Sequence, residues 1–114
     1  MNYAIWRINI SGPDPVAAFR YAHKILTEFM QKHGFEVTPH YLGIDTAWRA
    51  TWTQGKGGRT IGFNSEMDAL PGIGHACGHN LIAIGGVAAA LGVRAALEKS
   101  RIPGTVILLG TPGE

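Results

Sequence analysis

The segment SEMDALPGIGHACGHN, residues 65–80, concentrates side chains that can bind metals or move protons. It holds two acids, two histidines and the only cysteine of the chain. Cys77 and His79 are separated by one glycine, and Gly78 lets the backbone bend without a side-chain clash. Because a thiolate and an imidazole at this spacing can converge on one metal ion, the segment predicts a metal-binding loop.

The two acids of the segment, Glu66 and Asp68, stand two positions apart, so on a strand both side chains point to one face. Such carboxylates bind a metal or orient a histidine ligand, and solvated loop acids are the alternative. His75, in the same glycine-rich loop, is a further possible ligand or orienting residue.

Other interpretations of these side chains stay open at this point. A lone cysteine is most often a small buried hydrophobe, and a lone histidine is most often a surface residue, as we expect for His23 and His33. A structural zinc site is less expected, because its four ligands normally come in paired short spacings. Cys77 with His75 or His79 could also be the nucleophile and base of a thiol hydrolase, although the intervening glycine favours chelation.

The sequence before the loop predicts the first elements that position it. Asp14 followed by Pro15 is typical of a helix start, and Gly34 supplies a stop, so we expect a helix between them. The pattern then becomes β-like. Residues 47–53 and 59–65 are expected to pair as a hairpin through the glycine-bearing residues between them.

Two apolar segments follow the loop. Residues 81–97 carry almost no charge and predict a helix buried on most sides, whereas residues 105–109 predict a strand covered on both faces. Together the elements predict an α/β fold in which a partial layered sheet is flanked by helices. Glu114 comes just after the last strand, so it is a candidate general base if the sheet brings it near the metal loop.

Composition narrows the classes of function. The 114 residues are 46% hydrophobic and carry a net charge of +2. Because the sequence has no run of like charges, it does not predict a surface that binds nucleic acid or a membrane. No stretch resembles a membrane span or a secretory signal. A single cysteine excludes an intrachain disulfide and suits a reducing compartment, so we expect a cytoplasmic protein.

The motif DALPGIGHACGHN, the Ala- and Gly-rich helix after it, the hydrophobic strand and the closing GTPGE resemble the amidohydrolase branch of the aminoacylase and carboxypeptidase family of di-metal peptidases. Order and spacing match over about residues 34–114, and the motif is most similar to the dipeptidase-like subgroup. The resemblance implies that residues 1–114 form a single, incomplete N-terminal part of a zinc-exopeptidase-like catalytic domain. The family's downstream histidine ligands and its lid and dimerisation domain have no counterpart here.

The resemblance also implies roles for individual residues. Cys77 is similar to the ligand that bridges two divalent metals, and His79 to a terminal ligand of one of them. Asp68 resembles the family aspartate that orients the site, and Glu114 resembles the general base, so these two are the predicted catalytic residues. Glu66 occupies a position where related branches have a metal-ligating histidine.

The implied reaction is metal-dependent hydrolysis of an amide bond in a small dipeptide-like or N-acyl amino acid substrate. Thiolate and imidazole ligands favour zinc for the two divalent ions, with manganese, cobalt or nickel as alternatives. A homodimer is expected only for the complete protein. The competing hypothesis is a truncated, catalytically inactive relative that acts as a metal- or partner-binding module.

Overall fold

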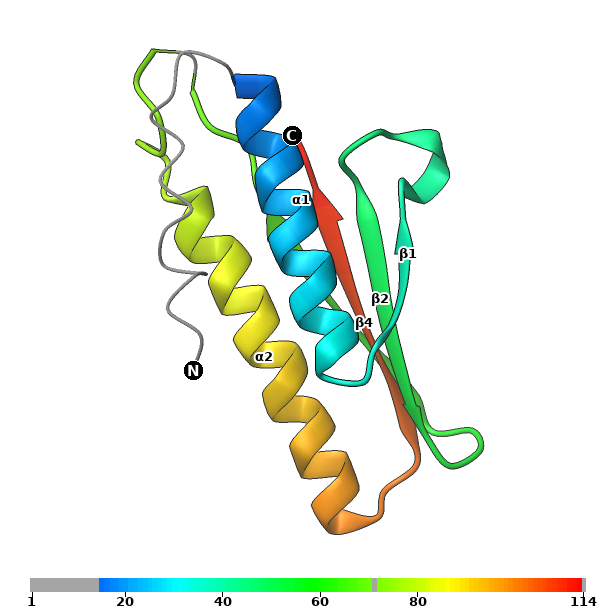
Figure 1. The fold of residues 1–114 in the computed structure, drawn as a ribbon. Coiled ribbons are helices and arrows are strands. Elements are labelled where there is room, and N and C mark those ends of the chain that lie inside the picture. Colours follow the sequence, from blue (N-terminus) through cyan, green and yellow to red (C-terminus); the bar gives the residue numbers. More distant parts are fainter. Residues whose placement is uncertain (1–14, 71, 114) are drawn as a thin grey trace.

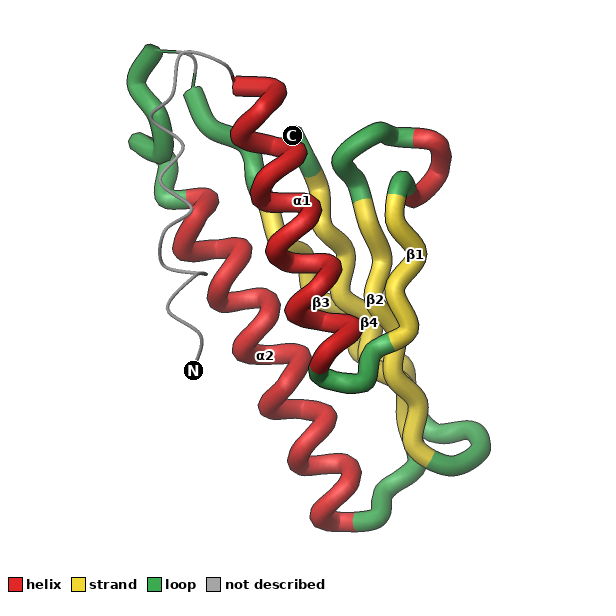
Figure 2. Tube along the Cα trace, in the orientation of Figure 1, coloured by secondary structure: helices red, strands yellow, loops and turns green. Residues whose placement is uncertain are grey.

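The computed structural model describes residues 15–70 and 72–113. Its elements are α1 (Pro15–Lys32), β1 (Glu36–Pro39), the short 3-10 turn η2 (Tyr41–Gly43), β2 (Trp48–Gln54), β3 (Arg59–Glu66), α2 (His79–Ser100) and β4 (Gly104–Thr111). The four strands form one mixed sheet in the order β1-β2-β4-β3. Both helices lie on the same face of the sheet, α1 over β1 and β2 and α2 over β3 and β4 (Figures 1 and 2).

The predicted first helix is confirmed as α1. Apolar residues spaced by four, Ala22, Leu26 and Met30, are buried against the sheet. The helix ends before Gly34, whose φ of 81° is a left-handed conformation that glycine adopts without strain. The expected N-cap, Asp14, lies outside the described residues.

The predicted hairpin is wrong, although both of its strands exist. β4 lies between β2 and β3, antiparallel to the first and parallel to the second. The connection after β2 crosses the start of β4, where a Cβ on Gly58 would come within 2.0 Å of the Pro103 carbonyl oxygen. A hairpin would have left the apolar strand β4 at an edge, whereas the crossover through α2 buries it in the middle of the sheet.

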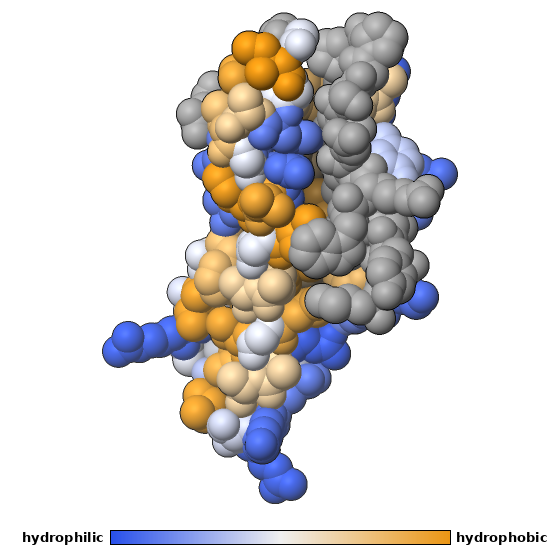
Figure 3. Space-filling view, turned by 90° about the vertical axis from the view of Figure 1, so that its left-hand side faces the viewer, coloured by the Kyte–Doolittle hydropathy of each residue, from blue (hydrophilic) through white to orange (hydrophobic). Residues whose placement is uncertain are grey.

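The expected burial of β4 and α2 is only half right. Along β4 buried and half-buried residues alternate, because helices cover one face of the sheet. On α2 only one stripe is buried, and side chains such as Leu81 and Ile82 are exposed. Figure 3 shows that apolar side chains run along the face of the molecule that it displays. By length and apolar composition alone α2 could cross a membrane, which is weak evidence because core helices share both properties.

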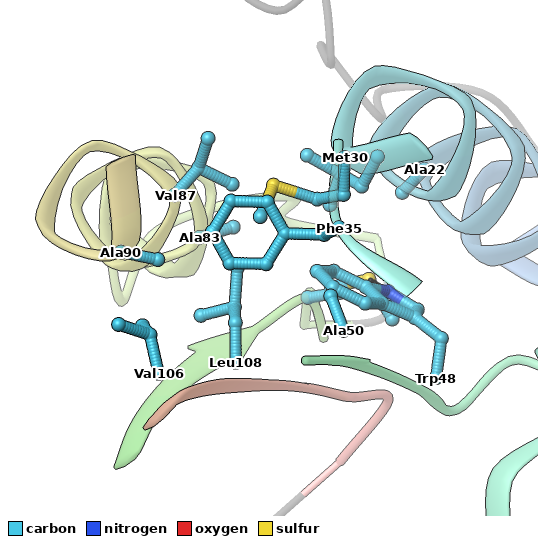
Figure 4. Packing of buried hydrophobic residues seen from close by; sticks show 12 residues of the cluster. Ala22, Met30, Phe35, Trp48, Ala50, Ala83, Val87, Ala90, Val106 and Leu108 are labelled. Carbon is cyan, nitrogen blue, oxygen red and sulfur yellow. Dashed lines mark hydrogen bonds between the residues drawn. The ribbon is translucent and has the colours of Figure 1, made fainter. Parts of the chain in front are cut away.

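The core between the layers centres on Trp48, which is fully buried and packs with Phe35, Met30 and Leu108 (Figure 4). The indole Nε1 donates to the sulfur of Met67 at 3.4 Å. Gly110 of β4 gives the ring its space, because a Cβ there would lie 2.0 Å from Nε1. These layers confirm the predicted α/β class and fix the end of the sheet from which the loop 67–78 departs.

Candidate metal and catalytic site

The predicted metal loop leaves the sheet at the end of β3, beside the end of the interior strand β4. Glu66, the last residue of β3, is the register partner of Thr111 at the end of β4. The next residue, Met67, is buried and its N–H donates to the Thr111 carbonyl at 2.9 Å. The loop therefore starts at the C-terminal ends of two parallel strands, where α/β proteins commonly place ligand sites.

Glycines shape the loop and deliver its last residue to α2. Leu70 and Gly74 exchange backbone hydrogen bonds of 3.0 and 2.9 Å around Gly72, and both glycines have left-handed φ angles. Gly78, with φ 79°, precedes the helix, and its carbonyl accepts the N–H of Leu81 at 2.9 Å. Since only glycine adopts such angles without a steric cost, the loop ends in a sharp turn that makes His79 the first residue of α2.

His79 lies between the two acids of the segment. Its side chain is 9% exposed, its Nδ1 is 2.7 Å from Asp68 Oδ1, and its Nε2 is 3.2 Å from Glu66 Oε2. A carboxylate only accepts, so Nδ1–H donates to Asp68 and Nε2 is the ring atom that faces Glu66. With its Nδ1 proton held in this way, a histidine binds a metal ion through Nε2. We call Glu66, Asp68 and His79 the carboxylate–histidine cluster.

His75 adds a second imidazole to the same loop. Within the described part of the chain, neither of its two solvent-inaccessible ring nitrogens makes a hydrogen bond. Burial lowers the pKa of His75, the charge of His79 lowers it further, and the charge of Asp68 acts in the opposite direction. Orphaned buried nitrogens are rare in folded proteins and point to a missing partner such as an ion or water.

The donor atoms suit zinc, but they form only part of a site. Thiolate sulfur, imidazole nitrogen and carboxylate oxygen are its usual protein ligands. The Cys77 thiol is exposed, and among the described residues no group of three or more such side chains is arranged to hold an ion. Catalytic zinc normally has three protein ligands, so Cys77 and His79 can supply only part of the set.

The structure thus brings together Glu66, Asp68 and His79. His75 lies close enough for the charges of Asp68 and His79 to shift its pKa. Glu114 lies outside the described residues. Between the described residues, no hydrogen bond is found from the Cys77 thiol to an imidazole, and the thiol is exposed. Sequence reasoning missed the turn after β1, which lines a cavity next to the end of β4 and carries no motif that would have revealed it.

The known proteins that this chain resembles are named as dipeptidases or as an amide hydrolase. The chain is 43% identical over its whole length to the human Xaa-Arg dipeptidase and 45% identical to the mouse protein of that name. Over 78% of the chain it is 35% identical to one of the subunits of p-aminobenzoyl-glutamate hydrolase from Escherichia coli. The chain spans 28% of the length of the two dipeptidases and 22% of the bacterial protein. No protein-family model matches the chain.

Proposed function

Because this chain is a relative of the dipeptidase-like amidohydrolases, matching part of their length, we propose that the full-length protein hydrolyses an amide bond in a small N-acyl amino acid or dipeptide-like substrate. Xaa-Arg dipeptidase and p-aminobenzoyl-glutamate hydrolase both carry names that describe cleavage between an acyl group and an amino acid. That shared chemistry supports the substrate class proposed for this chain.

The observation that carries the proposal is the 2.7 Å contact between Asp68 and His79. It orients the imidazole with Nε2 toward Glu66, at the edge of the sheet where the loop and the end of β4 meet. We assign His79 and Cys77 as ligands of a divalent metal pair, with zinc favoured by the sulfur and nitrogen donors. Asp68 is a positioning residue, and Glu66 and His75 are further candidates for holding or orienting the ions.

The remaining roles follow from the chemistry of amide hydrolysis. Bound metal ions would supply polarisation of the scissile carbonyl and a more acidic water. Glu114 would accept the proton of the attacking water and deliver it to the leaving amine nitrogen. Its place in the sequence, three residues after β4 ends, supports this role.

Chelation tests the proposal on the full-length protein. We expect hydrolysis of N-acyl amino acids or dipeptides that stops when a chelator removes the metal and resumes when zinc is restored. Hydrolysis that persists after complete metal removal, verified by elemental analysis, would contradict a metal-dependent reaction and favour the thiol chemistry of Cys77. Absence of hydrolysis across a panel of both substrate types would contradict the amidohydrolase assignment itself.

A further inference from the structure

Two histidines outside the carboxylate–histidine cluster stack on each other. His23 belongs to α1 and His40 immediately precedes η2, yet their ring centroids lie 5.0 Å apart with an angle of 19° between the ring planes. We call His23 and His40 the histidine pair. Neither residue has a part in the proposed amide hydrolysis, and their stack brings the helix together with the turn that follows β1.

Both rings are held in the same tautomer by the segment that follows η2. His23 Nδ1 lies 2.9 Å from the Thr46 carbonyl oxygen, and His40 Nδ1 contacts the carbonyl oxygen of Asp45. Because a carbonyl only accepts, each Nδ1 carries a hydrogen, and the lone pair of the neutral ring is on Nε2. Neither Nε2 is hydrogen-bonded to any of residues 15–70 and 72–113.

This arrangement is the one that metal-binding histidines adopt. Their second ring nitrogen commonly donates to a backbone carbonyl, which fixes the tautomer and the ring orientation and makes the ligating nitrogen more basic. The carbonyls of Asp45 and Thr46 are consecutive, so both Nδ1 atoms are directed at one short segment. Both Nε2 atoms therefore lie on the ring edges away from that segment, and the stack presents two nitrogen donors.

The backbone at His40 supports the same orientation. Its φ angle of 51° lies in a left-handed region that side chains rarely occupy, although histidine does so more often than most residues. Hydrogen bonds of 3.0 Å, from Tyr41 N–H to the Ala47 carbonyl and from Gly43 N–H to the His40 carbonyl, close the turn. The fold of the turn therefore sets the His40 ring against α1 without a ligand.

The charges and distances around the histidine pair admit a cation. The side chains of Arg20 and Asp45 pair with each other at 3.3 Å, so their charges cancel. Zinc–nitrogen bonds are about 2.0–2.1 Å long, so two Nε2 atoms that bind one ion must come within about 4 Å of each other. The His40 side chain is 60% exposed, which gives its ring room to tilt toward His23.

From this geometry we propose that the histidine pair is a second metal site, at which His23 and His40 bind one divalent transition-metal ion through their Nε2 atoms. Imidazole donors select zinc, nickel or copper over magnesium and calcium, which prefer oxygen ligands. Because the pair supplies two protein ligands, water completes the coordination and the ion is held more weakly than in the loop. The bound ion joins α1 to the turn after β1 and so stabilises the folded chain.

Zinc titration of the full-length protein tests this site. After the loop has been loaded with zinc and the excess removed by dialysis, calorimetry should detect one further zinc ion per chain. His23→Gln and His40→Gln should each weaken its binding at least about tenfold. His33→Gln is the matched control: His33 Nδ1 also bonds a carbonyl and its ring also stacks, but on Phe29, which cannot bind a metal.

Thermal unfolding separates metal binding from a purely structural stack. Excess zinc should raise the Tm of the wild-type protein and of His33→Gln by a few degrees, and much less in His23→Gln and His40→Gln, whatever their Tm without zinc. Magnesium should raise none of them. Equal zinc-dependent shifts in all four proteins, or no zinc binding beyond the loop, would overturn the proposal. Loss of binding in only one of the two pair variants would also overturn it, because the two rings would then not share the ion.

Discussion

Asp68, just beyond β3, and His79, the first residue of α2, are joined by a 2.7 Å hydrogen bond across eleven positions of the sequence. The bond links the end of a strand to the start of the helix that follows it. It also fixes the orientation of the His79 ring, because Nδ1 is engaged by Asp68 and Nε2 faces Glu66. A single carboxylate therefore orients the histidine on which the proposed metal site depends.

The first prediction concerns that carboxylate. Asp68→Asn keeps an oxygen acceptor but removes its charge, so in the full-length protein metal affinity should fall about 10- to 100-fold and turnover should fall with it. Affinity is measured by competition with a chelator of known strength. Asp45→Asn is the control, since Asp45 is an exposed partner of Arg20 and should leave both quantities unchanged. Identical behaviour of the two variants would show that Asp68 does not position His79.

The second prediction concerns proton transfer. Glu114→Gln in the full-length protein should retain its metal and lose turnover by about 10² to 10⁴, the usual contribution of a general base. Glu98→Gln, at an exposed position on α2, should keep normal turnover. Near-normal turnover of Glu114→Gln, measured with the metal content confirmed, would mean that another group activates the water.

Local patterns were sufficient to predict most elements but not their arrangement. α1, the strands β2, β3 and β4 and the apolar helix after the loop follow from glycines, apolar spacing and apolar runs, which are properties of neighbouring residues. The insertion of β4 between β2 and β3 depends on pairing between distant segments, which a glycine-rich connection does not reveal. The one-sided cover of β4 likewise depends on where both helices pack.

The third prediction tests the packing that sets α2 on the sheet. A Cβ on Gly86 would lie 2.4 Å from the hydroxyl of Ser65, which donates to the Ala83 carbonyl at 2.9 Å. Gly86→Ala should therefore lower the free energy of unfolding by about 1–3 kcal/mol. At Gly85 a Cβ meets no atom within 4 Å, so Gly85→Ala should raise that free energy by about 0.5–1 kcal/mol.

Thermal and urea unfolding of the two full-length variants measure this difference. Because both substitutions add one methyl group to adjacent helical positions, helix propensity alone would stabilise both. A Gly86→Ala variant as stable as Gly85→Ala would show that α2 does not approach β3 as closely as the structure describes.

The clustering of candidate side chains was predictable from the sequence where their types and their close spacing coincide in one segment. Residues 65–80 indicate a metal loop by their composition, and the structure places the side chains of Glu66 and Asp68 in contact with the ring of His79. The cavity next to the end of β4 had no such signal, because its walls come from η2, β2 and β4. The left-handed angles of His40 and Leu42 depend on hydrogen bonds to residues 45 and 47, and neither position holds a glycine that would have indicated them.

The metal content of purified full-length protein tests the central claim most directly. Elemental analysis should find divalent metal, with zinc favoured, in the wild-type protein and in the control variant His33→Ala. The His33 ring hydrogen-bonds to the Phe29 carbonyl and stacks on the Phe29 ring. Cys77→Ala and His79→Ala should each lose most of that metal and nearly all amide hydrolysis. Unchanged metal content in both variants would contradict the assignment of this loop as the metal site.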